Sequence, residues 1–148
     1  MELNKDFEEF FELLNKHKVQ YVVVGGYAVI FHGYPRFTGD IDIFYRAEKQ
    51  NIKALLDALK EFGFNLPELS AEELIVKGQV VQLGQPPNRI DLLNSITDGE
   101  FSAIWQKRVA GTYGRKSVFY IHLEDLKKNK KGVGRPKDQQ DLEFFEKK

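Results

Sequence analysis

The chain contains no cysteine among its 148 residues. It therefore has no disulfide, no thiolate metal site and no cysteine nucleophile, and any metal must be bound through oxygen or imidazole. Oxygen ligands favour hard cations, so Mg²⁺ is the expected metal and Mn²⁺ its closest substitute. The absence of cysteine thus favours an oxygen-ligated cation over a thiolate-bound one.

Long apolar runs are also missing. No stretch approaches the roughly 18 consecutive apolar residues that a membrane span needs, and the N-terminus has no basic start followed by an apolar signal segment. We therefore expect no membrane partner and a cytoplasmic location. The chain lacks internal repeats, and its 42% hydrophobic and 30% charged residues fit one domain over residues 1–148.

The formal net charge is zero, but the two signs are distributed unevenly. Residues 1–100 carry 10 Lys and Arg against 16 Asp and Glu, and residues 101–148 carry 12 against 6, so the two parts have charges of −6 and +6. The basic part could meet a triphosphate or an RNA backbone. The alternative is a solvated helix end that balances the acidic part.

Hydrophobic periodicity predicts the first elements of the fold. Apolar residues at helical spacing after Asn4 predict a capped helix within residues 1–18. The apolar run 21–24 predicts a buried strand, followed by a short helix that ends near 32–33 and a second strand over 40–45. A helix, a strand, a helix and a strand therefore lead to the first acidic pair of interest.

That pair is Asp40 and Asp42 on the second strand. Side chains alternate along a strand, so Ile41, Ile43 and Tyr45 point to one face and can be buried, and both acids share the other face. Residues two apart on a strand are separated by roughly 7 Å. Two carboxylates therefore face the same site.

A third acid, Asp91, lies between Ile90 and Leu92 in a further predicted strand, 89–93. If this strand pairs near the Asp40 strand, Asp91 completes a cluster of three carboxylates. The remaining predicted elements are a helix over 52–59 capped by Gly63, a strand over 80–83, a helix around 101–105, and a hairpin of 109–113 with 118–121. A C-terminal helical segment is predicted over 122–148, with a break at 132–134 and a last helix from Pro136. Phe144 and Phe145 are expected to tether this last helix to the domain.

Clustered carboxylates and a glycine turn suggest chemistry on a phosphate. Gly25 and Gly26 follow the apolar strand and can present backbone N–H groups at a helix start, where phosphate oxygens bind. Three carboxylates can hold two divalent cations, which neutralise the attacking and leaving oxygens of a transferred phosphoryl group. An Asp-x-Asp pair alone is weak evidence for a metal site, because nine aspartates in 148 residues give about half of one such pair by chance. The conjunction of glycine turn, acidic pair and third acid is much rarer.

Three segments resemble the DNA polymerase β-type nucleotidyltransferase superfamily: 25–28 its glycine turn, 38–43 its acidic pair and 89–93 its third acid. The segment 134–138, Gly-Arg-Pro-Lys-Asp, followed by 141–143, is similar to the C-terminal element of the small AbiEii-toxin-like and lincosamide-nucleotidyltransferase-like branch. The resemblance implies an α/β (α+β) nucleotidyltransferase fold, with a mixed, mostly antiparallel sheet flanked by helices and a short C-terminal helical segment.

The resemblance also implies roles for individual residues. Asp40 and Asp42 would bind two Mg²⁺ ions, and Asp91 would bind the catalytic one. Gly25 and Gly26 would hold the β and γ phosphates. Further residues implied in nucleotide binding are Arg36 and Thr38, which would line the pocket, and Lys130, Arg135 and Lys137, which would contact the triphosphate or fix the last helix. Lys137 and Asp138 have the alternative of a structural ion pair.

One position departs from the family pattern, because Tyr27 stands where many relatives place a serine that meets phosphate. The histidines, His17, His32 and His122, have no metal-ligand spacing and favour surface or capping roles. Trp105 fits a helix packing face better than a base-stacking platform.

The function implied is Mg²⁺-dependent transfer of a nucleoside monophosphate from a nucleoside triphosphate to a hydroxyl of RNA, protein or a small molecule. The chain is short for an enzyme with its own acceptor domain, so a homodimer or a separate partner could complete the cleft. The alternative is a catalytically silent nucleotide-binding module, or a toxin–antitoxin component of the same fold that pairs with an antitoxin.

Overall fold

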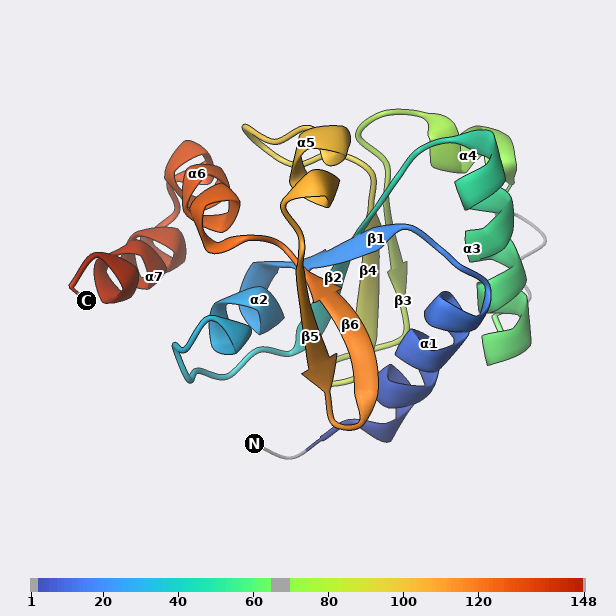
Figure 1. Ribbon diagram of the computed structural model, residues 1–148, viewed down its shortest axis with the longest axis horizontal. Helices are drawn as coiled ribbons and strands as arrows, with labels where there is room; N and C mark the ends of the chain where they lie inside the picture. The colour runs from blue at the N-terminus through green and yellow to red at the C-terminus, as the bar shows by residue number, and fades with distance from the viewer. Residues whose placement is uncertain (1–2, 65–69, 148) are drawn as a thin grey trace.

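The structure, a computed structural model, describes residues 3–64 and 70–147. In chain order its elements are α1 (Lys5–Lys16), β1 (Tyr21–Val24), α2 (Gly25–Phe31), β2 (Asp40–Tyr45), α3 (Lys49–Phe62), α4 (Ala71–Ile75), β3 (Val80–Leu83), β4 (Arg89–Leu93), α5 (Phe101–Gln106), β5 (Val109–Tyr113), β6 (Lys116–Tyr120), α6 (Leu123–Val133) and α7 (Pro136–Glu146). Figure 1 shows how they are arranged. None of the described helices combines the length and apolar character needed to cross a membrane.

The six strands form one open sheet in the order β3-β4-β2-β1-β6-β5. β1 with β2, β3 with β4 and β5 with β6 pair antiparallel, and β1 with β6 and β2 with β4 pair parallel. The sheet is thus mixed and mostly antiparallel with helices around it, as the sequence predicts for a nucleotidyltransferase-like fold. The parallel pair β2 and β4 lies near the middle of the sheet and carries the acidic residues.

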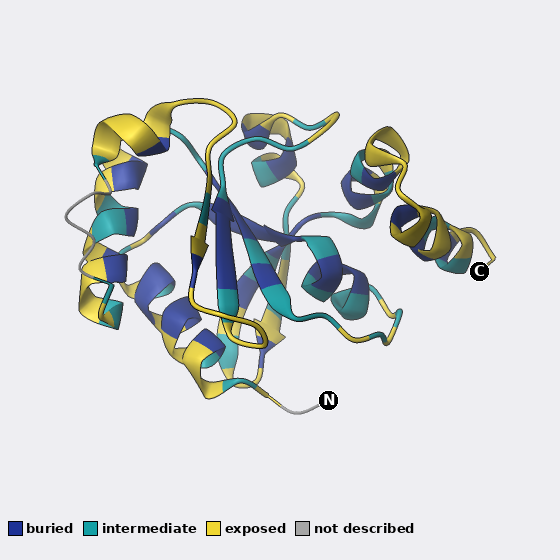
Figure 2. Cartoon of the chain, turned by 180° about the vertical axis from the view of Figure 1, so that it is seen from behind, coloured by how far each residue is buried: buried dark blue, intermediate teal, exposed yellow. Residues whose placement is uncertain are grey.

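Two hydrophobic cores lie on opposite faces of the sheet. One packs α1, α3 and α4 against residues such as Ile41, Ile43 and Tyr45, and the other packs α2, α5, α6 and α7 against Phe44 and its neighbours. β1 is buried throughout because its alternate side chains enter both cores. In Figure 2 the buried centre of the sheet contrasts with the exposed outer surfaces of the flanking helices. The strands around the acids are therefore fixed from both sides.

Local signals set several boundaries. The Asn4 side chain accepts hydrogen bonds from the backbone N–H groups of Asp6 and Phe7, which caps α1 as predicted. Gly63 ends α3 with a left-handed φ of 110°, also as predicted. The sequence analysis missed α4, although Ser70 caps it by accepting a hydrogen bond from the N–H of Glu73. A five-residue helix offers too little periodicity to be recognised from apolar spacing.

The C-terminal segment differs from the expectation in one respect. The predicted break at 132–134 is wrong in extent, because α6 continues through Val133 and ends only at Gly134, which has a φ of 71°. One left-handed glycine is enough to redirect the chain into α7, which begins at Pro136 as predicted. The expected tether is confirmed: Phe145 is buried, and Phe144 stacks on Tyr34 with ring centroids 4.4 Å apart.

Candidate active site

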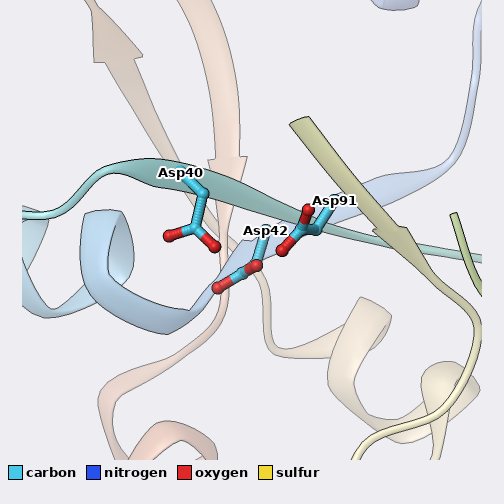
Figure 3. A group of neighbouring side chains, drawn as sticks. All are labelled: Asp40, Asp42 and Asp91. Atoms are coloured by element: carbon cyan, nitrogen blue, oxygen red, sulfur yellow. The ribbon is translucent and has the colours of Figure 1, made fainter. Parts of the chain in front are cut away.

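Three carboxylates converge where β2 and β4 begin. The parallel register of these strands places Asp42 beside Asp91, and Asp40 beside Arg89. Asp40, Asp42 and Asp91 each offer one oxygen, and these oxygens all lie within 4.8 Å of one another. Figure 3 shows the three side chains turned toward one another from the two strands. The structure thus brings together the three acids singled out in the sequence, whose catalytic and metal-binding roles stay predictions.

Strand alternation explains why the acids share this face. Ile41 and Ile43 are at most 1% exposed within the core beneath the sheet, so Asp40 and Asp42 must point to the opposite side. Asp91 follows the same rule, because Leu92 enters that core. Burial of the apolar residues therefore determines the direction of the acidic ones.

The glycine pair has a structural role that the sequence did not reveal. A Cβ on Gly25 would lie 2.0 Å from Oδ2 of Asp42, and a Cβ on Gly26 would lie 2.7 Å from Oγ1 of Thr38. Gly25 also has a left-handed φ of 69°. α2 begins at Gly25 itself, rather than after the pair. The glycines therefore let the start of α2 approach the acidic pair, and their phosphate contacts stay a prediction.

Arg89 belongs to the site and was missed in the sequence. Its Nη2 donates to Oδ2 of Asp40 at 2.6 Å and to Oδ2 of Asp91 at 3.1 Å, and its Nε donates to Oδ1 of Asp91 at 3.0 Å. These hydrogen bonds raise the pKa of Arg89 above its ordinary value, the bond to Asp40 most of all. The available signal was position: Arg89 precedes Asp91 by two residues, so both share one face of β4.

The three carboxyl groups have different proton affinities. Burial, followed by the charges of Asp40 and Asp91, raises the pKa of Asp42 from its ordinary 3.8 to about 7. Burial also acts to raise the pKa of Asp40, but hydrogen bonds with Asp91 and Arg89 outweigh it and lower that pKa. The pKa of Asp91 is raised by burial and by its hydrogen bond with Asp40, with Arg89 opposing. Asp42 is therefore the acid whose negative charge the protein compensates least.

Three of the cations expected to meet the nucleotide are engaged in an ion network around two buried aspartates. Arg36 donates to both oxygens of Asp141 at 2.9 and 3.0 Å, and Nζ of Lys130 lies 3.0 Å from both Asp138 and Asp141. Arg135 donates from Nε to Asp138 at 2.8 Å. The side chains of Lys130 and both aspartates are at most 5% exposed. The network ties α7 to α6 and to the loop before β2. Fixing the last helix was one of the two roles expected of Lys130 and Arg135, whereas Arg36 was expected only to line the pocket. Contacts of all three residues with a nucleotide stay a prediction.

The alternative of a Lys137–Asp138 ion pair is wrong. Asp138 is the third residue of α7, accepts from the backbone N–H of Arg135 and points inward to Lys130. Adjacent helix residues diverge by about 100°, so Lys137 lies on another face, and among the described residues it forms no ion pair. Its charge acts to lower the pKa of Asp40 and Asp42, which places it near the cluster. Asp138 is held ionised, since its bonds to Arg135 and Lys130 outweigh burial and lower its pKa to about 2.

Hollows adjoin the acids on several sides. One of about 230 Å³ is lined by all three acids together with the predicted nucleotide-binding residues, Gly25, Gly26, Arg36, Thr38, Lys130, Arg135 and Lys137, and by Arg89. A second, of about 500 Å³, reaches Asp42 and Asp91 from the side of Lys77, Val80 and Val133. A third, of about 580 Å³, shares Arg36 and Thr38 with the first but contains none of the acids. Of these three hollows, the first is therefore the one in which all three carboxylates meet.

The remaining candidates have structural roles. His17 and His32 end α1 and α2, and His122 caps α6 by accepting from the N–H of Glu124, so the capping prediction is confirmed. Trp105 packs against the core of α2, α5, α6 and α7, and the guanidinium of Arg108 lies 3.7 Å from its ring centroid. Tyr27 packs against Phe7 and Tyr113, so an aromatic cluster accounts for the departure from serine.

The donor set suits a hard divalent cation. It offers only carboxylate oxygens, from two adjacent strands, and one of them, Asp42, carries a charge that the protein leaves poorly compensated. The mixed sheet, with three convergent aspartates beside a helix that starts at a glycine, is consistent with a nucleotidyltransferase-like fold. The chain belongs to the family described as nucleotidyltransferase of unknown function (DUF6036), which matches residues 1–145. No curated protein matches it.

Proposed function

We propose that this protein transfers a nucleoside monophosphate from a nucleoside triphosphate to an acceptor hydroxyl, with Mg²⁺ held by Asp40, Asp42 and Asp91. The observation that carries the proposal is the meeting of three carboxylate oxygens within 4.8 Å beside the start of α2. The family match names the same class of reaction. Bound cations would neutralise the negative charge that develops on the transferred phosphoryl group.

The chain's own groups then have defined tasks. Gly25 and Gly26 at the start of α2, and Thr38, line the hollow in which the triphosphate would lie, and backbone N–H groups at the glycines are the donors that its phosphates would use. Lys137 adds positive charge at its rim, and Arg36, Lys130 and Arg135 hold the surrounding elements in place. Asp91 is placed to take the proton of the acceptor hydroxyl as its oxygen bonds to the α-phosphorus and pyrophosphate leaves.

The acceptor belongs to the same proposal. The second hollow, on the side of Asp42 and Asp91, adjoins Lys77 and Arg135, and Lys128 and Lys131 lie around a further hollow on α6. This surplus of cations favours an RNA acceptor over a cationic small molecule. The C-terminal Gly-Arg-Pro-Lys-Asp element supports placement near the AbiEii-toxin-like and lincosamide-nucleotidyltransferase-like branch. A cytoplasmic location and a single catalytic domain over residues 1–148 complete the proposal.

The test is transfer of label from α-labelled nucleoside triphosphates to total RNA, protein or small molecules in the presence of Mg²⁺. We expect the wild type and Asp57→Asn to label one acceptor class, and Asp42→Asn to lose at least about 100-fold in rate, since it removes one of the charges that would hold the cation. Asp57 is exposed on α3, behind the sheet, and matches the chemical change. Equal labelling by Asp42→Asn and the wild type would refute the assigned site.

A second function is favoured by one observation, the aromatic packing of Tyr27 at the position of the family serine. Without the serine that many relatives have at this position, the fold could bind a nucleotide as a silent module, or act with an antitoxin or a second copy of itself. Calorimetry separates the two functions. Mg²⁺-dependent nucleotide binding with no labelled product in any acceptor class would support the silent module.

A further inference from the structure

Arg89 engages the oxygens that a metal would need. Both oxygens of Asp91 accept hydrogen bonds from its guanidinium, and so does Oδ2 of Asp40. The same three acids are the only ones in the described residues that come together as a potential metal site. A cation bound to Asp40 and Asp91 must therefore compete with a resident positive charge.

The position of Arg89 is set by the sheet. It pairs with Asp40 across the parallel strands and precedes Asp91 by two residues, so its side chain emerges on the acidic face. The fork geometry of the guanidinium allows it to join two carboxylates at once, which a lysine cannot reproduce. Without this bridge, three carboxylates within 4.8 Å would repel one another.

The Arg89 side chain also borders open space. Its side chain is 28% exposed, and Arg89 lines the hollow of about 230 Å³ that contains Gly25, Gly26 and Lys137. A guanidinium released from the acids would stay within this hollow, where the phosphates of a nucleotide are proposed to lie. Guanidinium groups bind phosphate oxygens in the same bidentate manner in which they bind carboxylate oxygens.

From this geometry we infer that Arg89 is a positioning residue that acts as an exchangeable counter-cation. It keeps Asp40 and Asp91 together when no metal is bound, competes with the divalent cation for them, and on release binds the phosphates of the nucleotide. This inference rests on the proposed function, because it takes the acids to be metal ligands. It further requires that loss of the arginine affect metal and nucleotide affinity in opposite directions.

The decisive measurement is Mn²⁺ binding in the absence of nucleotide. Electron paramagnetic resonance detects the Mn²⁺ that stays free. Arg89→Gln should bind Mn²⁺ at least about 10-fold more tightly than the wild type, because a unit positive charge is removed from beside the site. The same variant should bind the metal–nucleotide complex at least about 10-fold more weakly, because a charged phosphate contact is lost. Arg115→Gln, in the exposed β5–β6 turn, is the matched control and should alter neither affinity.

A residue that only supports the fold would give a different result. Arg89→Gln would then bind both Mn²⁺ and nucleotide more weakly, which would overturn the inference. Arg89→Lys keeps the charge without the fork, so its Mn²⁺ affinity should lie between those of the wild type and Arg89→Gln. If Arg89→Lys bound Mn²⁺ as tightly as Arg89→Gln, the result would contradict competition between the positive charge at position 89 and the metal.

A readout on the wild type avoids any folding defect of the variants. The Nε–H of Arg89, bonded to Asp91 in the structure, should give a protected side-chain signal in nuclear magnetic resonance that shifts when Mg²⁺ is added. An unchanged signal at saturating Mg²⁺ would overturn the inference while leaving the metal site intact. If neither the wild type nor Arg89→Gln binds Mn²⁺, the proposed function fails together with the inference.

Discussion

Replacing Asp42 by asparagine should stabilise the metal-free protein while abolishing its metal response. Burial, and then the charges of Asp40 and Asp91, raises the pKa of Asp42 from 3.8 to about 7. At about 1.36 kcal/mol per pH unit, this difference corresponds to an upper limit of roughly 4 kcal/mol for ionising Asp42 in the folded state. Because the side chain is only partly buried and shares protons with its neighbours, we expect about 2 kcal/mol.

The sign follows from the two states of the chain. Below pH of about 4, Asp42 is protonated in both the folded and the unfolded protein and costs nothing. Between about 4 and 7, the unfolded chain releases the proton and the folded protein retains it, so stability falls as pH rises. Above about pH 7 the full penalty applies. Asparagine is neutral throughout and avoids it.

The assay is thermal unfolding in a chelator across this pH range. At about pH 8, Asp42→Asn should melt roughly 4–8 °C above the wild type, from about 2–4 °C per kcal/mol in a chain of this size. The gap should close toward pH of about 4. Adding Mn²⁺ should raise the melting temperature of the wild type and of Asp57→Asn, but not that of Asp42→Asn. A gap that does not change with pH, or a less stable Asp42→Asn at high pH, would refute this account of the site.

Three further predictions concern the surroundings of the cluster. Gly25→Ala should destabilise the protein by about 2 kcal/mol and weaken Mn²⁺ binding, because its Cβ would lie 2.0 Å from Oδ2 of Asp42 at a left-handed φ; an unchanged urea midpoint and Mn²⁺ affinity would contradict it. Lys130→Met should cost about 3 kcal/mol in urea unfolding, since it leaves two buried aspartates short of a partner, whereas the exposed Lys128→Met should cost less than about 0.5 kcal/mol; equal costs would show that the network is not structural. Mn²⁺ affinity should increase as pH rises through about 7, with proton release visible by calorimetry in buffers of different ionisation enthalpy; an affinity that is flat across this range would mean that Asp42 does not exchange its proton for the metal.

Several elements could be predicted from local sequence because their causes are local. The alternation of Asp40, Ile41, Asp42 and Ile43 determines which side chains a half-buried strand must turn outward, and the observed strand covers the predicted residues 40–45. Asn4 predicted the start of the first helix because a cap acts within its own turn. The face on which Asp40 and Asp42 lie therefore follows from local sequence, without any tertiary contact.

The sequence alone fixed the residue types and their faces: the acids of the two strands, the flexible glycine turn and the apolar residues that bury the opposite side. Only the tertiary structure decided their partners. The parallel register of β2 with β4 brought Arg89 between Asp40 and Asp91. The packing of α7 against α6 placed Lys130 within ion-pair distance of Asp138 and Asp141. Periodicity depends on neighbours a few residues apart, whereas the partner of a charge is chosen among groups 49 or 105 positions away, as for Arg89 with Asp40 and Arg36 with Asp141. That choice depends on how the whole chain packs.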